Sequence, residues 1–207
     1  MSTVLQQATR IGVLGGSFDP IHYGHLAVAE EMRVQQALDA VLFVPTRQAP
    51  HKGAGVATAE QRYLMTQLAI AGNPCFFVSR IELDRSGPSY TVETLRELHI
   101  QYPTADLYFI IGADMAMDFY NWREPEIIME LAQVVAVNRP GLALEQVRHQ
   151  LEWPQVSRML FAEVPALDIS STDLRARTAG GRSLRYLTPE PVAVYIAKEG
   201  LYREQGS

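Results

Sequence analysis

Short, almost wholly apolar runs alternate along the chain with longer segments in which apolar and polar residues recur at helical spacing. Apolar runs of this length are typical of strands buried on both faces, as in a parallel sheet. The amphipathic segments between them are typical of the helices that connect such strands. The pattern therefore predicts an α/β fold with a doubly wound parallel sheet. The expected strands are 10–14, 40–44, 75–78, 107–111 and 133–137, and the expected helices lie near 23–37, 58–71, 91–101 and 124–131.

The last quarter of the chain predicts helices rather than strands. Residues 170–178 begin with serines that can cap a helix and are followed by a glycine pair that favours a helix end. A Thr-Pro-Glu segment at 188–190 opens the next helix, with threonine as the cap and proline in the first helical position, and Gly200 ends it. We therefore expect one domain over residues 1–207, with a sheet core over about 10–165 and a C-terminal helical part over about 169–203.

Composition and charge narrow the classes of function. The formal net charge of −5 argues against a broad basic surface for nucleic acid, so anionic ligands must meet locally gathered cationic side chains. No stretch approaches the ~20 apolar residues of a membrane span. Residues 1–10 lack the apolar core of a signal peptide, which predicts a cytoplasmic protein. The single cysteine, Cys75, fits a reducing compartment and is expected to be a buried strand residue without a chemical role.

The first predicted strand runs into a segment with candidate chemistry, Gly-Gly-Ser-Phe-Asp-Pro-Ile-His-Tyr-Gly-His, from Gly15 to His25. The adjacent glycines Gly15 and Gly16 let the backbone turn sharply and let a ligand approach closely. Ligands of parallel α/β sheets bind beyond the carboxyl ends of the strands, and the N-terminus of the following helix favours phosphate. His22 and His25 share a face of this helix start, and Gly24 removes a side chain that would block a phosphate.

Other glycine and histidine motifs are absent or incomplete in the sequence. The glycines do not form the G-x-G-x-x-G of dinucleotide-binding folds, and the chain contains no G-x-x-x-x-G-K-[ST]. Zinc is a weaker alternative: His22, His25 and His51 can be ligands, but no cysteine pair or H-E-x-x-H lies beside them. An isolated histidine usually caps a helix or lies on the surface. Two histidines on one face behind a double-glycine turn favour a functional site.

Residues Gly15–His25 resemble the signature of the nucleotidyltransferase superfamily, with His22-Tyr-Gly-His25 as its H-x-G-H motif. The chain as a whole resembles bacterial-type nicotinate-mononucleotide adenylyltransferases, which implies a Rossmann-like nucleotidyltransferase fold. Two positions depart from the usual pattern of this family: Ser17 replaces a threonine and keeps its hydroxyl, and Ala49 stands where a second proline is usual. The resemblance runs from about Ile11 to Arg203, and its supporting segments are Ala49–Lys52, Pro88–Leu95, Ile111–Asp114, Trp122 and Ile169–Arg175.

The resemblance implies an enzyme of NAD biosynthesis that transfers AMP from ATP to nicotinate mononucleotide, giving nicotinate adenine dinucleotide and pyrophosphate. The attacking phosphate oxygen is already an anion, so the protein must mainly position two anions and neutralise charge. Mg²⁺ is expected to arrive with ATP, because the sequence shows no dedicated metal cluster. Two alternatives stay open: a preference for nicotinamide mononucleotide, and a non-catalytic nucleotide-binding protein of the same fold. The sequence does not predict the oligomeric state.

Hydroxyl and acidic side chains extend the candidate site for ATP. Ser170 lies at a second predicted helix N-terminus suited to phosphate, although with Asp173 it can equally be a helix cap. Asp114 follows a strand and can accept bonds from ribose hydroxyls, or only cap a helix. The resemblance implies that the catalytic residues are His22, His25, Lys52 and Arg175, and that ATP is bound by Gly15, Gly16, Ser17, Phe18, Gly112, Asp114, Ile169, Ser170, Ser171 and Thr172.

A separate group of residues is expected to bind the mononucleotide. Trp122 can stack on a pyridine ring, although an apolar core position is the usual place for tryptophan. Backbone N–H groups near Thr91 and Arg123 can bind the carboxylate of nicotinate, which a nicotinamide group would leave unpaired. Tyr90 and Thr91 can also simply begin a helix. The predicted mononucleotide-binding residues are Tyr90, Thr91, Trp122 and Arg123.

Overall fold

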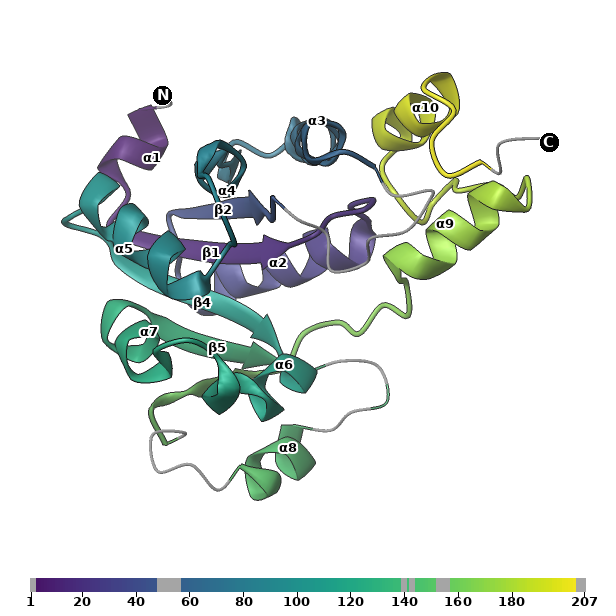
Figure 1. Cartoon of the computed structure of the whole chain (residues 1–207). Helices are drawn as coiled ribbons and strands as arrows, with labels where there is room; N and C mark the ends of the chain where they lie inside the picture. The colour runs from purple at the N-terminus through teal and green to yellow at the C-terminus, as the bar shows by residue number, and fades with distance from the viewer. Residues whose placement is uncertain (1–2, 48–56, 139–140, 142–143, 152–156, 204–207) are drawn as a thin grey trace.

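Six parallel strands form one sheet in the order β3-β2-β1-β4-β5-β6 (Figure 1). The computed structural model describes residues 3–47, 57–138, 141, 144–151 and 157–203. The chain moves outward from β1 in one direction and then returns to place β4 beside β1, so the strand order reverses between these two strands. Ligands of doubly wound sheets bind at such a reversal. The strands are β1 Arg10–Gly16, β2 Ala40–Pro45, β3 Phe76–Val78, β4 Asp106–Gly112, β5 Gln133–Val137 and β6 Leu160–Ala162.

Both faces of the sheet are buried, because successive side chains of a strand point to opposite faces and each face has its own core. In β2, Leu42 belongs to one core and Val41 and Phe43 belong to the other. In β5, Val134 and Val135 divide in the same way. This division confirms the predicted doubly wound sheet and explains why its strands are apolar at consecutive positions.

Helices cover the two faces and the carboxyl ends of the strands. One core contains residues of α1, α4, α5, α6, α7 and α8, and the other contains residues of α2, α3, α9 and α10. Figure 1 shows α9 and α10 together beyond the carboxyl ends of the strands, with α1 at the opposite end of the sheet. The helices are α1 Thr3–Gln7, α2 Tyr23–Gln35, α3 Ala59–Ile70, α4 Ile81–Asp84, α5 Thr91–Gln101, α6 Ala113–Met117, α7 Pro125–Leu131, α8 Leu144–Gln150, α9 Ser171–Ala179 and α10 Glu190–Lys198, with a 3-10 turn at Phe119–Asn121.

Two details of the predicted elements are wrong, and several short elements were not predicted. Cys75 is half-buried and lies in the turn before β3 rather than inside a strand. Thr188 does not cap α10: Pro189 is the N-cap, and the Thr188 hydroxyl instead donates to the Ile21 carbonyl at 2.7 Å. The strand β6 and the short helices α1, α4, α6 and α8 were not expected, because each is too short to show a periodic pattern.

Candidate functional site

A cavity of about 410 Å³ lies beyond the carboxyl ends of β1 and β4, where the strand order reverses. It brings the glycine turn after β1 together with Thr91 and Trp122, two of the four residues predicted to bind the mononucleotide. The predicted residues that line it are Gly15, Gly16, Ser17, His22, His25, Thr91, Gly112, Trp122 and Ile169. The predicted residues that lie outside its lining are Phe18, Tyr90, Asp114, Arg123, Ser170, Ser171, Thr172 and Arg175, and Lys52 lies outside the described residues.

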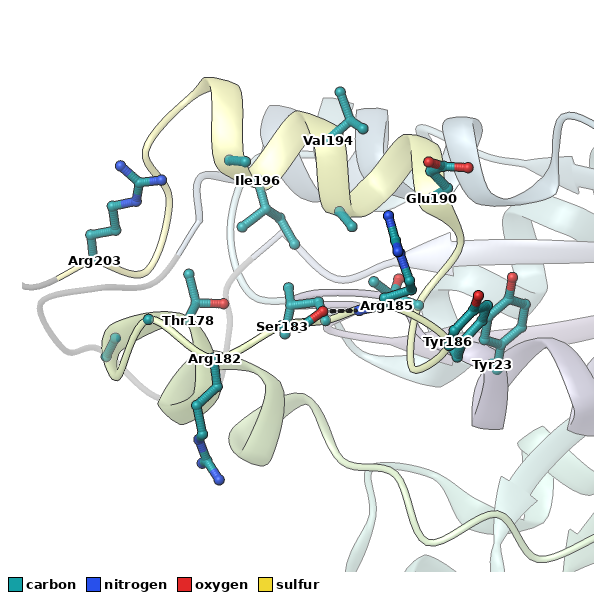
Figure 2. Close-up of a pocket in the computed structure, with 16 residues that line it drawn as sticks. Tyr23, Thr178, Arg182, Ser183, Arg185, Tyr186, Glu190, Val194, Ile196 and Arg203 are labelled. Carbon is teal, nitrogen blue, oxygen red and sulfur yellow. Dashed lines mark hydrogen bonds between the residues drawn. The ribbon is translucent and has the colours of Figure 1, made fainter.

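A larger cavity of about 960 Å³ lies between α10 and the segment that follows α9 (Figure 2). Arg182, Arg185 and Arg203 line it, but their guanidinium groups point in different directions in Figure 2. They therefore do not converge on one anion. Since this cavity also lacks the glycine turn and both histidines, we place the candidate nucleotide site in the smaller cavity at the strand ends.

The turn after β1 depends on close packing around its two glycines. A Cβ atom at Gly16 would lie 3.0 Å from the ring of Phe18, whereas a Cβ at Gly15 would meet nothing within 4 Å. Phe18 itself has a φ of 50° and is 1% exposed, with its ring edge-on to His25 at 5.1 Å between centroids. Phe18 therefore supports the His25 ring from the core, and Gly15 is the position that leaves room for a ligand.

The two histidines are stacked at the start of α2. Their ring centroids lie 3.7 Å apart at an interplanar angle of 28°, and His22 is the N-cap of the helix. The backbone N–H of His22 donates to Nδ1 of His25 at 3.2 Å. Because Nδ1 accepts this bond, a neutral His25 carries its proton on Nε2. Nε2 is thus the ring atom through which a neutral His25 donates a hydrogen bond.

Gly24 is required for a reason that differs from the expectation. A Cβ atom at this position would lie 3.0 Å from Cε1 and Nδ1 of His22, closer than ordinary contacts allow. The sequence predicts that Gly24 leaves space for a phosphate. In the structure, the nearest obstacle to a side chain is the ring of His22, so the glycine first of all permits the stacked arrangement of the histidines.

Side chains from distant parts of the chain hold the backbone between β1 and α2. Four carbonyl oxygens of this turn each accept a bond at 2.6–2.9 Å from a buried or half-buried side chain. A carbonyl oxygen carries partial negative charge and repels a phosphate. Because each of these four oxygens accepts a bond from a protein donor, the repulsion is reduced. The pairs are Arg62 to Ser17, Arg175 to Asp19, Ser171 to Pro20 and Thr188 to Ile21.

Asp19 is the buried centre of this support. It is 3% exposed, and its Oδ1 accepts bonds from the hydroxyl of Tyr202 at 2.7 Å and from the backbone N–H of Ala57 at 3.1 Å. Burial and the neighbouring Asp19 carboxylate raise the pKa of the Tyr202 hydroxyl above its ordinary value. Arg62 is 1% exposed, and burial lowers the pKa of its guanidinium while the charge of Asp19 opposes that shift. The sequence analysis gave Asp19 no role although it lies within Gly15–His25, and it missed Arg62 and Tyr202 because they lie far from this segment along the chain.

The start of α9 lies beside this turn, and its polar groups bind protein atoms. Oγ of Ser170 accepts a bond from the Asp173 backbone N–H at 3.1 Å, which makes Ser170 the helix cap that the sequence allowed as an alternative. The hydroxyl of Thr172 accepts a bond from Nη2 of Arg175 at 3.3 Å. Of this segment, Ile169 is the residue that lines the cavity.

The other end of the cavity is formed around the N-terminus of α5. Trp122 lines the cavity while it also packs against Phe119, 5.2 Å between ring centroids, so it belongs to both the site and the core. Thr91 is the first residue of α5. Tyr90 is its N-cap and lies under the guanidinium of Arg123, 4.7 Å from the ring centroid. Helix N-termini carry free N–H groups that suit an anion.

Polar residues that the sequence analysis missed also line the cavity. Asn138 follows β5 at the same edge of the sheet. Because ligands of parallel sheets bind beyond the carboxyl ends of the strands, its position directly after a predicted strand could have identified it. Its side chain exchanges two hydrogen bonds with the backbone of Val164, at 3.1 and 2.6 Å. Glu82, on the short helix α4, and Thr94, on α5, line the end of the cavity near α5. Thr94 lies in the segment Pro88–Leu95 that supports the resemblance, whereas Glu82 has no such motif beside it.

Asp114 lies in the first turn of α6, where Gly112 is the N-cap, and its side chain is exposed.

In the part of the chain that the structure describes, no group of three or more His, Cys, Asp or Glu side chains is arranged to hold a metal ion. Within the same residues, no helix has the length and apolar character needed to span a membrane.

A parallel sheet with a glycine turn and a histidine pair at its switch point defines a nucleotide-binding α/β protein. Comparison with known proteins agrees. Residues 13–177 match the cytidylyltransferase-like family. The chain is 53% identical to a protein of Roseiflexus castenholzii named "Probable nicotinate-nucleotide adenylyltransferase", over 94% of this chain and 98% of that protein. A Thermus thermophilus protein of the same name is 52% identical over 94% of this chain and 100% of its own length.

The chain belongs to the nicotinate-nucleotide adenylyltransferases within the cytidylyltransferase-like family. Its fold is also that of a solved structure, "Plasmodium falciparum nicotinic acid mononucleotide adenylyltransferase complexed with NaAD", with a TM-score of 0.76 over 94% of this chain and 97% of that one. The two sequences are 21% identical, so this likeness supports the fold alone.

Proposed function

We propose that this protein is a cytoplasmic enzyme of NAD biosynthesis that transfers AMP from ATP to nicotinate mononucleotide. An oxygen of the mononucleotide phosphate attacks the α-phosphorus of ATP, a new P–O bond forms, and pyrophosphate leaves with the electrons of the bond that breaks. The observation that carries this proposal is a single cavity that joins the stacked histidines at the start of α2 to Trp122 and the start of α5. Such a cavity can hold two anionic nucleotides with their phosphates side by side.

At the ATP end of the cavity, the N-terminus of α2 and Nε2 of His25 bind phosphate oxygens and stabilise charge in the transition state. Mg²⁺ is part of the ATP substrate and neutralises the polyphosphate. The whole chain acts as one domain, since side chains of the C-terminal helix α9 hold the turn after β1. The other residues that we propose to bind ATP or to act on its phosphates are Gly15, Gly16, Ser17, Phe18, His22, Lys52, Gly112, Asp114, Ile169, Ser170, Ser171, Thr172 and Arg175.

At the acceptor end, Trp122 stacks on the pyridine ring, and N–H groups near Thr91 and Arg123 bind the nicotinate carboxylate beside Tyr90. An amide in the same place presents its own NH₂ to these donors, and such mismatches discriminate strongly. We expect kcat/KM to favour nicotinate over nicotinamide mononucleotide by at least about a hundredfold, roughly 2.7 kcal/mol.

A panel of acceptors assayed for dinucleotide and pyrophosphate with Mg-ATP tests the proposal. Folded protein that forms no dinucleotide with any acceptor would show that it is a non-catalytic nucleotide-binding protein. Equal kcat/KM for the nicotinate and nicotinamide acceptors would reject the pocket assignment while leaving adenylyl transfer in place.

The role of His25 is tested in the same assay. Removing a donor aimed at developing charge costs about 3 kcal/mol, so His25→Ala should lower kcat about a hundredfold and change the KM for ATP much less. His99→Ala, at an exposed position near the end of α5, is the matched control and should keep full activity. A His25→Ala enzyme with normal kcat would make the histidine pair structural.

A further inference from the structure

Glu82 is a buried carboxylate in the wall of the cavity whose role is not yet accounted for. It is 7% exposed, contacts Thr94 of α5 and lines the same cavity as Trp122. Its Oε1 accepts a hydrogen bond from the hydroxyl of Thr94 at 2.7 Å. Its Oε2 is buried and has no hydrogen-bond partner among the described residues. Burying a charged oxygen without a hydrogen-bond partner costs free energy, and a ligand group that binds the oxygen removes that cost.

The hydrogen bonds around Glu82 engage Oε1, and an ionised carboxylate can offer its other oxygen, Oε2, only as an acceptor. Nη1 of Arg85 donates to the hydroxyl of Thr94 at 3.1 Å, while Nε of Arg85 donates to Glu97 at 2.7 Å. Because Thr94 has one hydroxyl proton and accepts from Arg85, it gives that proton to Oε1 of Glu82. Glu82 lines the cavity, and the last torsion of a glutamate is soft, so a small rotation that moves both carboxylate oxygens together lets Oε2 meet a bound ligand.

The chemistry of the acceptor then identifies the group that Glu82 binds. At neutral pH, the phosphate and the carboxylate of nicotinate mononucleotide are hydrogen-bond acceptors, and its donors are the ribose hydroxyls. A pyridine carboxylate beside Glu82 would also place two like charges together in a buried site. We infer that Glu82 binds a ribose hydroxyl of the acceptor mononucleotide and thereby orients its sugar. This inference rests on the proposed function.

The test measures the Kd of nicotinate mononucleotide and of its 2′-deoxy and 3′-deoxy forms by calorimetry, and kcat/KM for each with Mg-ATP. The wild-type protein should bind one deoxy form about ten- to a hundredfold more weakly, the effect of one hydrogen bond to a charged group. In Glu82→Ala this discrimination should fall to within about twofold, with an unchanged KM for ATP. Thr94 can then donate to the Tyr90 carbonyl, which already lies 3.4 Å from its hydroxyl, so the variant should fold.

Glu97→Gln is the matched control, since it removes a carboxylate partner of Arg85 that does not line the cavity, and it should keep the wild-type discrimination. Discrimination that persists in Glu82→Ala would overturn the inference. So would a Glu82→Gln enzyme whose kcat/KM rises for nicotinate relative to nicotinamide mononucleotide, because Glu82 would then face the pyridine substituent. If the wild-type protein forms no dinucleotide, the proposed function fails, and the Kd values still decide whether Glu82 binds ribose.

Discussion

Replacing Tyr202 with phenylalanine isolates one bond in the buried support of the turn after β1. The Tyr202 hydroxyl donates to Asp19 at 2.7 Å, and the two residues are 7% and 3% exposed. Phenylalanine keeps the packing of the ring and removes only the donor. A hydrogen bond to a buried charged group contributes about 1.5–3 kcal/mol, so we expect the free energy of unfolding to fall by about 2 kcal/mol. For a chain of 207 residues this corresponds to a loss of roughly 4–8 °C in Tm.

Urea unfolding followed by circular dichroism measures this change, and the m-value should stay constant. Tyr195→Phe is the control: Tyr195 is a half-buried residue of α10, and no hydrogen bond of its hydroxyl is found among the described residues. A loss below about 0.5 kcal/mol in Tyr202→Phe, or an equal loss in both variants, would refute the reasoning that Asp19 depends on this donor.

The same contact predicts a pH dependence. Burial and Asp19 hold the pKa of Tyr202 above its ordinary value of about 10. Below that pH both the folded and the unfolded protein keep the phenolic proton, and the contribution to stability is fully present. Above it the unfolded protein loses the proton while the folded protein retains it, so stability falls as pH rises, by at most about 1.4 kcal/mol per pH unit. Between pH 9 and 11, stability should fall more steeply in the wild-type protein than in Tyr202→Phe.

Four further substitutions test other parts of the structure. Gly24→Ala should displace the His22 ring and lower kcat at least about tenfold, whereas Gly15→Ala should leave Tm unchanged because its Cβ meets no protein atom within 4 Å. Trp122→Ala should raise the KM of both pyridine mononucleotides roughly tenfold, since stacking does not depend on the carboxylate. Hydrogen bonds from Thr9 lower the pKa of Asp39, so this carboxylate stabilises the fold above pH ~4 and loses that effect as pH falls. In Asp39→Asn, the free energy of unfolding measured against pH should therefore fall less steeply below pH ~4 than in the wild-type protein. The difference should be less than about 1 kcal/mol, because solvent screens the exposed group.

The strands could be predicted where burial on both faces makes consecutive positions apolar. β2 and β5 meet this condition, and their predicted ranges agree closely with the observed ones. β6 does not, because only Leu160–Ala162 pair with β5 and two of these three residues are not fully buried. Such a strand is held by its neighbour in the sheet and not by its own pattern, so the sequence does not reveal it.

The candidate site could be predicted only where it is continuous along the chain. The turn from Gly15 to His25 has a local pattern with a local meaning, and the structure brings most of it to the cavity. Tyr202 lies 183 residues from Asp19 along the chain, and Glu82 is carried by a helix of four residues. Neither residue has a neighbouring motif, and their importance appears only when the packing brings them to their partners.

Arg175 supports the turn after β1, and its role at the ligand stays a prediction because it lies outside the lining of the cavity. The resemblance implies a role at the ATP phosphates, and in the structure Nη1 donates to the Asp19 carbonyl at 2.7 Å while Nη2 donates to Thr172 at 3.3 Å. A guanidinium has five N–H donors, so these two bonds leave three for another acceptor. The bond to Asp19 fixes the guanidinium beside the turn that begins at Gly15. An arginine held in this way loses little side-chain entropy when it binds a phosphate, whereas a lysine has too few donors in a fixed plane to satisfy both partners.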